Sequence, residues 1–97
     1  MKTAKTRPAL VVQADNLHTE LSQVIVAMIT SQMFRAGYPC RVTVLLNTMG
    51  GQGSGLLTDS VVMADNLATM TLSAIYCVIG SLPMSEVDKA LKYTLGL

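Results

Sequence analysis

Short apolar segments separated by turn signals constrain the fold of this chain more than any other feature of the sequence. Residues 9–13, 24–30 and 41–46 are rich in β-branched side chains and are bounded by polar, glycine or proline residues, which predicts strands. The longest unbroken apolar run, Val24 to Ile29, is far shorter than the roughly 20 residues that span a bilayer. Its continuous apolar character predicts a strand buried on both faces. We therefore expect a chain built mainly from strands, without a membrane-spanning segment.

The spacing of apolar residues changes near the C-terminus. Val87, Ala90 and Leu91 recur at helical intervals, with charged residues between them, which predicts an amphipathic helix. Ser85 and Asp88 have the spacing of a capping box at its start. Several short strands closed by one helix predict an α+β fold that is mostly β, a small barrel-like domain with a C-terminal helix.

Length and composition limit how this fold is organised. The 97 residues are 51% hydrophobic and 13% charged, and two separate cores would each be too small, so we expect one domain, residues 1–97. A domain of this size leaves apolar surface uncovered, which predicts a homodimer. The N-terminal residues lack the apolar stretch of a signal peptide, so a cytoplasmic location is expected.

The cysteines and the glycine-rich stretch carry no clear chemistry. Cys77 lies in an apolar segment and is expected to be a small buried hydrophobe, and neither it nor Cys40 has the spacing of a metal site. Residues 49–55 are glycine-rich, but no Gly-Lys-Ser/Thr follows them, so a phosphate-binding loop is rejected. We expect a flexible hairpin connection there, with no helix, and we expect neither a metal nor a cofactor.

The order of these segments resembles the MazF/PemK toxins of bacterial toxin–antitoxin systems. The resemblance extends from about Lys5 to Leu97 and is carried by an Arg-Pro strand start, a Thr-Ser-Gln strand end and two later segments: Lys5–Asp15, Ile25–Gln32, Gly55–Val62 and Ile79–Leu82. It implies an SH3-like barrel that forms a homodimer and cuts single-stranded messenger RNA without a metal. It also implies an antitoxin whose tail occupies the RNA groove.

The resemblance further implies the site residues. Arg7 matches the family's catalytic arginine and Thr30 its catalytic threonine or serine. A guanidinium can bind phosphate oxygens through two hydrogen bonds, and a hydroxyl can hold a non-bridging oxygen. Asp65 matches an acidic position used in some members, which carry an arginine where this chain has Met63. The predicted substrate-binding residues are Ser31, Gln32, Asp15 and Asp65.

Each of these assignments has a simpler alternative. Arg7 could be an exposed cation at a strand start, Thr30 could satisfy backbone groups at a strand end, and Asp65 could form a turn before Asn66. His18, the single histidine, is a further candidate for a general base.

Two other functions remain open at this stage. Only residues 1–6 precede Arg7, so we expect the family's first strand and its loop to be absent, which favours an inactive homologue that still binds antitoxin or RNA. A gyrase poison of the CcdB type would share the fold. Such a poison would not need an arginine at the start of one strand and a threonine at the end of another, so an RNA-cutting toxin is the favoured prediction.

Overall fold

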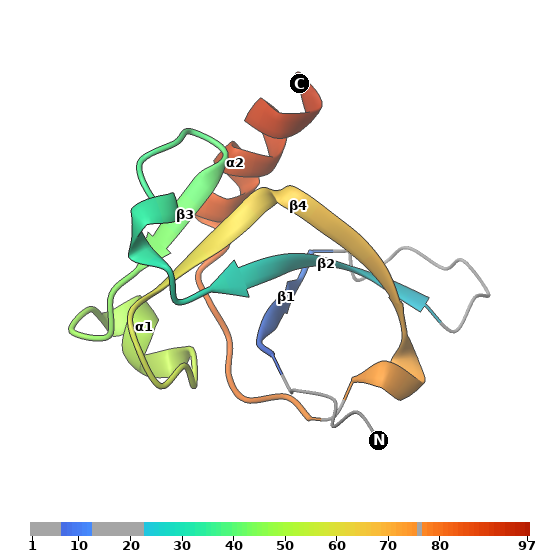
Figure 1. The fold of residues 1–97 in the computed structure, drawn as a ribbon, viewed down its shortest axis with the longest axis horizontal. Helices are drawn as coiled ribbons and strands as arrows, with labels where there is room; N and C mark the ends of the chain where they lie inside the picture. Colours follow the sequence, from blue (N-terminus) through green and yellow to red (C-terminus); the bar gives the residue numbers. More distant parts are fainter. Residues whose placement is uncertain (1–6, 13–22, 76) are drawn as a thin grey trace.

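The fold is a curled, four-stranded antiparallel sheet with a helix at the C-terminal end of the chain (Figure 1). It was obtained as a computed structural model that describes residues 7–12, 23–75 and 77–97. The strands are arranged in the order β1-β2-β4-β3, and their bounds are Ala9–Val11 (β1), Gln23–Thr30 (β2), Arg41–Val44 (β3) and Ser60–Thr71 (β4). The helical segments are Met33–Arg35 (η1), Met49–Gly53 (α1), Leu72–Ala74 (η2) and Ser85–Leu95 (α2). This mostly β architecture with a terminal helix confirms the predicted fold class.

The long strand β4 organises the sheet because it pairs with β2 along one side and with β3 along the other. Its pairing with β2 is interrupted, since Ala27 lies opposite Leu67 whereas the next residue, Met28, lies opposite Met63. The residues Ala64–Asn66 are thus left out of the β2 ladder and form a wide bulge. Bulges bend a strand and increase its twist, and β4 bends sharply near its middle in Figure 1.

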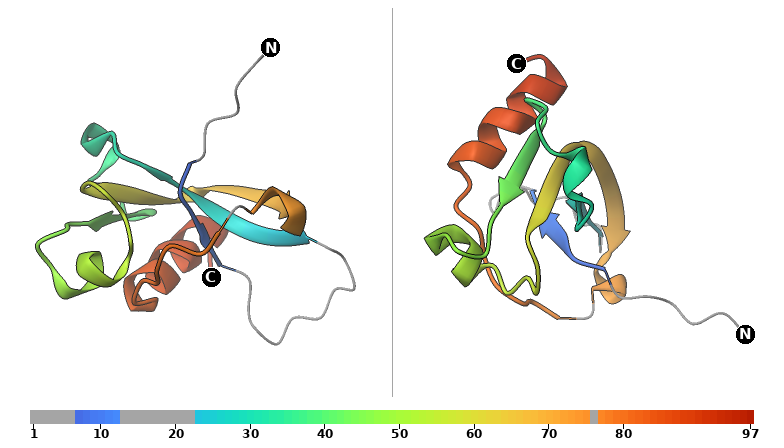
Figure 2. Two further views of the ribbon diagram at one scale, coloured as in Figure 1. Left: turned by 90° about the horizontal axis from the view of Figure 1, so that it is seen from below. Right: turned by 60° about the vertical axis from the view of Figure 1, so that its left-hand side comes forward.

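One face of the sheet carries a hydrophobic cluster whose centre is Ala27, Val44 and Val62. Partly buried hydrophobic side chains pack around this centre: Leu10, Val12, Ile29, Val42, Leu56 and Leu82. Helix α2 packs against β3 and β4 (Figure 2), and its buried Val87 lines the same small hollow as Val44. The helix therefore covers this face of the sheet.

The opposite face is also covered over part of its area. Val26 and Val61 point to that side, because each directly precedes a cluster residue in its strand and successive side chains point to opposite faces. Both are buried. Beyond the bulge it is the cluster face that is less covered, since Ile25, which alternates with the buried Val24 and Val26, is 37% exposed. The prediction that the whole run 24–30 is buried on both faces is therefore wrong at Ile25.

The glycine-rich stretch is not a flexible hairpin, and the expectation that no helix begins there is wrong. Helix α1 starts at Met49, capped by the Thr48 hydroxyl, which accepts a hydrogen bond from the Gly51 amide at 3.1 Å. The segment then packs directly on the chain before α2, where the Ser81 amide donates to the Gly53 carbonyl at 3.0 Å. Gly55 lets the two backbone segments approach closely, because a Cβ at this position would collide with the carbonyl of Ile79.

Two smaller predictions are corrected as well. Cys77 is exposed and lies outside any strand, and both it and the half-buried Cys40 are free thiols. The predicted capping box is absent, since the residue at the N-cap of α2 is Met84 and no side chain caps that end. Helix α2 ends at Gly96, whose left-handed backbone (φ 72°) directs its amide to the carbonyls of the last turn.

Two glycine substitutions distinguish a glycine that is favoured by its positive φ alone from one that is also required by close backbone packing. Gly55 and Gly37 both have positive φ, 73° and 95°, but only at Gly55 would a Cβ meet backbone atoms. We expect Gly37→Ala to lower the free energy of unfolding by about 1 kcal/mol through backbone strain alone. Gly55→Ala should lower it by about 3 kcal/mol because strain and overlap combine. Urea unfolding measures both, and equal losses would contradict the close packing at residue 55.

Candidate active site

The register of β1 and β2 brings Arg7 and Thr30 to the same end of the sheet. Ala9 lies opposite Met28 in the antiparallel ladder, so continuing the ladder by two residues places Arg7 across from Thr30. Thr30 faces the side of the sheet away from the hydrophobic cluster, because side chains alternate along a strand and Ile29 belongs to the cluster. Arg7 is exposed and Thr30 is half-buried. A permanent cation and a hydroxyl are thus found at the same accessible end of the sheet.

The Thr30 hydroxyl is oriented by the chain that follows it. Its Oγ1 accepts a hydrogen bond from the Gln32 amide at 3.1 Å. A hydroxyl has one proton to donate and two lone pairs, and within the described part of the chain the proton has no acceptor. The alternative that Thr30 satisfies backbone groups is therefore correct for its oxygen, yet the proton stays available to a ligand.

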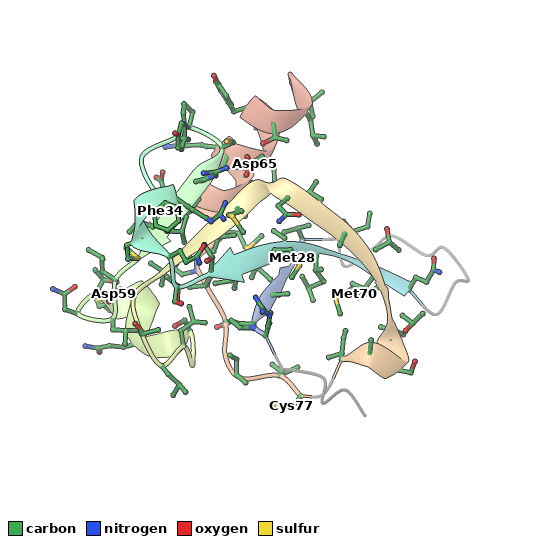
Figure 3. All side chains as sticks on the ribbon, viewed as in Figure 1. Met28, Phe34, Asp59, Asp65, Met70 and Cys77 are labelled. Carbon is green, nitrogen blue, oxygen red and sulfur yellow. The ribbon has the colours of Figure 1, made fainter. Side chains whose placement is uncertain are left out.

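The residues after Thr30 form a short polar surface. Ser31 and Gln32 are both exposed, and the Gln32 Oε1 accepts a hydrogen bond from Arg35 Nε at 2.8 Å. The Arg35 guanidinium lies 5.3 Å from the centre of the Phe34 ring, and the Phe34 side chain, labelled in Figure 3, is 78% exposed. A cation, an amide and an aromatic face are thus presented together on the segment that includes η1.

Asp65 lies in the bulge of β4 and not in a turn, so the turn interpretation is wrong. Figure 3 places Asp65 beside the bend of that strand. Its two carboxylate oxygens accept hydrogen bonds from Arg41, with Nε–Oδ1 at 3.3 Å and Nη2–Oδ2 at 3.0 Å. These bonds hold the pKa of Asp65 below its ordinary value, and the bonded carboxylate raises the pKa of Arg41. At neutral pH the pair is therefore ionised.

Sequence reasoning missed Arg41, which lies next to a departure from the family pattern that the sequence reveals. Met63 stands where the resemblance would place an arginine, and Arg41 is the direct cross-strand neighbour of Met63 in the β3–β4 ladder. The cation beside Asp65 therefore comes from β3. No local signal could have identified it, because the two partners are separated by 24 positions in the sequence.

The remaining predictions fall elsewhere or outside the described residues. Asp15 and His18 lie in 13–22, which the structure does not describe. Among residues 7–12, 23–75 and 77–97, no group of three or more His, Cys, Asp or Glu side chains could hold a metal ion. No helix in that part of the chain is long and apolar enough to cross a membrane. A hollow of about 150 Å³ between β3, α1 and α2 includes neither Arg7 nor Thr30.

Comparison with known proteins decides the family. Residues 1–95 match the sequence model described as PemK-like, MazF-like toxin of type II toxin-antitoxin system. This chain belongs to the PemK/MazF-like toxin family. The match includes Arg7, Thr30 and Asp65, so the family assignment covers the whole candidate site.

Other PemK/MazF-like proteins resemble the chain over nearly its full length. Endoribonuclease MazF2 of Mycobacterium bovis is 35% identical over 98 residues, covering 97% of this chain and 82% of that protein. Endoribonuclease MazF6 of Mycobacterium tuberculosis gives the same values. The structure of Mycobacterium tuberculosis toxin MazF-mt6 has a TM-score of 0.74 at 28% identity, over 94% of this chain and 87% of that one.

A further solved structure supports the fold alone. It is an endoribonuclease from a mycobacterial species in complex with its cognate antitoxin, and it matches with a TM-score of 0.74 at 23% identity. It covers 94% of this chain and 82% of that one.

The Arg41–Asp65 pair should make stability depend on pH in the acid range. Because the pKa of Asp65 is lower in the folded protein, the pair stabilises the fold fully above the unfolded carboxyl pKa of about 4. That contribution is lost as the pH falls through the lower, folded value. Wild type should therefore exceed Asp65→Asn in urea midpoint near neutral pH, and the difference should shrink at about pH 3. A difference that stays constant with pH would contradict this assignment.

Proposed function

We propose that this chain is a toxin of a type II toxin–antitoxin system that acts as an endoribonuclease on single-stranded messenger RNA. The observation that supports the proposal most is the register of β1 and β2 in a PemK/MazF-like sheet, because the start of β1, which Arg7 precedes, lies at the same end of the ladder as Thr30. The relatives named endoribonuclease MazF support the reaction class.

The chemistry proposed for this site is transfer of the phosphodiester to the substrate's own 2′-hydroxyl. The 2′-oxygen forms a bond to phosphorus, the bond from phosphorus to the 5′-oxygen breaks, and one proton leaves the nucleophile while another reaches the leaving oxygen. Negative charge grows on the non-bridging oxygens during this step. Arg7 offers two parallel N–H donors to those oxygens and Thr30 offers its hydroxyl proton, so both groups stabilise the transition state.

Asp65 is poorly suited to take the proton from the 2′-hydroxyl. A carboxylate whose pKa is lowered by two hydrogen bonds from Arg41 is a weaker base than a free one. We assign Asp65 to the support of Arg41, and Ser31 and Gln32 to contact with the RNA bases.

The proposal includes the setting in which the toxin works. Residues 1–97 act as one domain in the cytoplasm, where messenger RNA is found, and a cognate antitoxin blocks the RNA site. The family description names toxins of type II toxin–antitoxin systems, which supports such a partner.

The enzyme proposal predicts metal-independent cleavage that depends on both site residues. In EDTA, the purified chain should cut a long single-stranded RNA at specific sites. Arg7→Ala and Thr30→Ala should each reduce the rate by about 100-fold or more, since each removes a donor to the developing charge. Lys89→Ala, which removes a surface ion pair on α2, is the matched control and should cut normally.

The outcomes of this assay separate the alternatives. Intact RNA with folded wild-type protein would sink the nuclease proposal and favour an inactive homologue that binds antitoxin or RNA. Intact RNA together with trapped cleavage of DNA by gyrase would favour a CcdB-type poison instead.

The proposed toxin is also expected to be a homodimer. Large hydrophobic side chains remain largely exposed in the single chain, among them Met49, Leu57 and Val78. A single exposed hydrophobic residue is ordinary, so the expectation rests on the family together with the number of large hydrophobic side chains that are exposed. Sedimentation equilibrium should give twice the chain mass of 10.3 kDa, and a monomer at micromolar concentration would contradict the expectation.

A further inference from the structure

The Arg41 guanidinium joins the distant β4 bulge to the segment that directly precedes β3. Its Nε and Nη2 donate to the Asp65 carboxylate in the β4 bulge. Its remaining terminal nitrogen, Nη1, donates to the backbone carbonyl of Arg35 at 2.9 Å. The guanidinium also lies 4.8 Å from the centre of the Tyr38 ring. One planar side chain therefore connects β3, the β4 bulge and the end of η1.

These contacts fix the segment that follows Thr30. Two local backbone hydrogen bonds stabilise residues 31–36. The Arg35 amide donates to the Gln32 carbonyl at 3.0 Å, and the Ala36 amide donates to the Met33 carbonyl at 3.1 Å. A single 3₁₀ turn has poor hydrogen-bond geometry and is only weakly stable by itself. The bond from Arg41 to Arg35 links that turn to the sheet, because Asp65 already holds the guanidinium in place.

We propose that Arg41, held by Asp65, is a positioning residue of the RNA site: it fixes residues 31–36 so that Gln32, Phe34 and Arg35 read the unpaired bases next to the scissile phosphate. The inference rests on the proposed nuclease function and deepens it. Arg41 acts through the η1 backbone and does not touch the reacting atoms.

The chemistry of the fixed segment suits an unpaired base. The exposed Phe34 ring offers a stacking face, which is how proteins commonly hold single-stranded bases. The Gln32 amide oxygen already accepts a hydrogen bond from Arg35, which leaves its NH₂ group to donate to a base edge. The terminal nitrogens of Arg35 make no hydrogen bond in the described part of the chain and can bind a phosphate or a base acceptor.

The geometry explains why arginine is needed at position 41. A lysine would keep the charge, but its single ammonium cannot bond both carboxylate oxygens and also reach the Arg35 carbonyl in one plane. Asp65→Asn keeps the size of the partner while removing its charge. Both substitutions therefore weaken the clamp, defined here as Arg41, Asp65 and the Arg35 carbonyl, with little change in packing volume.

The test compares wild type with Arg41→Ala, Arg41→Lys, Asp65→Asn and the double variant Arg41→Ala/Asp65→Asn, with Lys89→Ala as the ion-pair control. Two quantities are measured: amide hydrogen exchange of residues 31–36, and the ratio of kcat/KM at the preferred RNA cut site to that at a secondary site. Circular dichroism and thermal unfolding identify any variant that fails to fold, and Asp65→Asn then replaces Arg41→Ala as the informative variant.

The proposal expects faster exchange in residues 31–36 in all clamp variants, and a preferred-to-secondary ratio lowered by about 10- to 100-fold, because small misplacement of a positioning group has effects of that size. Arg41→Lys should recover only part of the loss. The double variant should resemble Arg41→Ala, since groups that act as one unit are not additive.

Three results would overturn the inference. These are unchanged exchange in folded Arg41→Ala, an unchanged site ratio while exchange rises, and complete restoration of the wild-type ratio by Arg41→Lys. Failure of the proposed function is separate from these results, because wild type would then cut no RNA in EDTA. In that case the exchange measurement alone still decides whether Arg41 holds residues 31–36.

Discussion

The bulge in β4 is the constraint on which the rest of this structure depends. A strand paired on both sides must bend for the sheet to curl, and β4 does so by leaving residues 64–66 out of its ladder with β2. That bend places Asp65 beside the start of β3, where Arg41 meets it. Since Arg41 also holds the η1 turn, the bulge links the curvature of the sheet to the shape of the candidate RNA site.

Much of the fold could be predicted from local sequence signals. β1 and β3 lie within the predicted segments 9–13 and 41–46, β2 begins one residue before the predicted segment 24–30, and the helical period near the C-terminus corresponds to α2. Arg7 and Thr30 could be identified because each stands at the end of a recognisable strand motif. Their roles in catalysis stay predictions, and the register of β1 and β2 shows that the start of β1 and the end of β2 lie at the same end of the sheet.

The missed features all depend on contacts between distant residues. Arg41 and Asp65 carry no mark of their pairing in the sequence, because the bulge that brings them together follows from tertiary packing. The glycine-rich stretch contains a helix, against the low helix propensity of glycine, because Thr48 caps it and the chain around Gly53 packs on Ser81. The exposure of Cys77 could not be predicted for a related reason, since its apolar neighbours belong to a connecting segment and not to a strand.

The contact between Arg41 and η1 is made to a main-chain oxygen, and this has a consequence for how the family can diverge. The Arg35 carbonyl would be present whatever side chain stood at that position, so the clamp holds residues 31–36 without specifying their identity. Side chains on this segment can therefore be exchanged during evolution while the scaffold below them keeps its geometry. A toxin built in this way can acquire a new target sequence by substitutions on one short turn, without having to redesign the sheet that supports it.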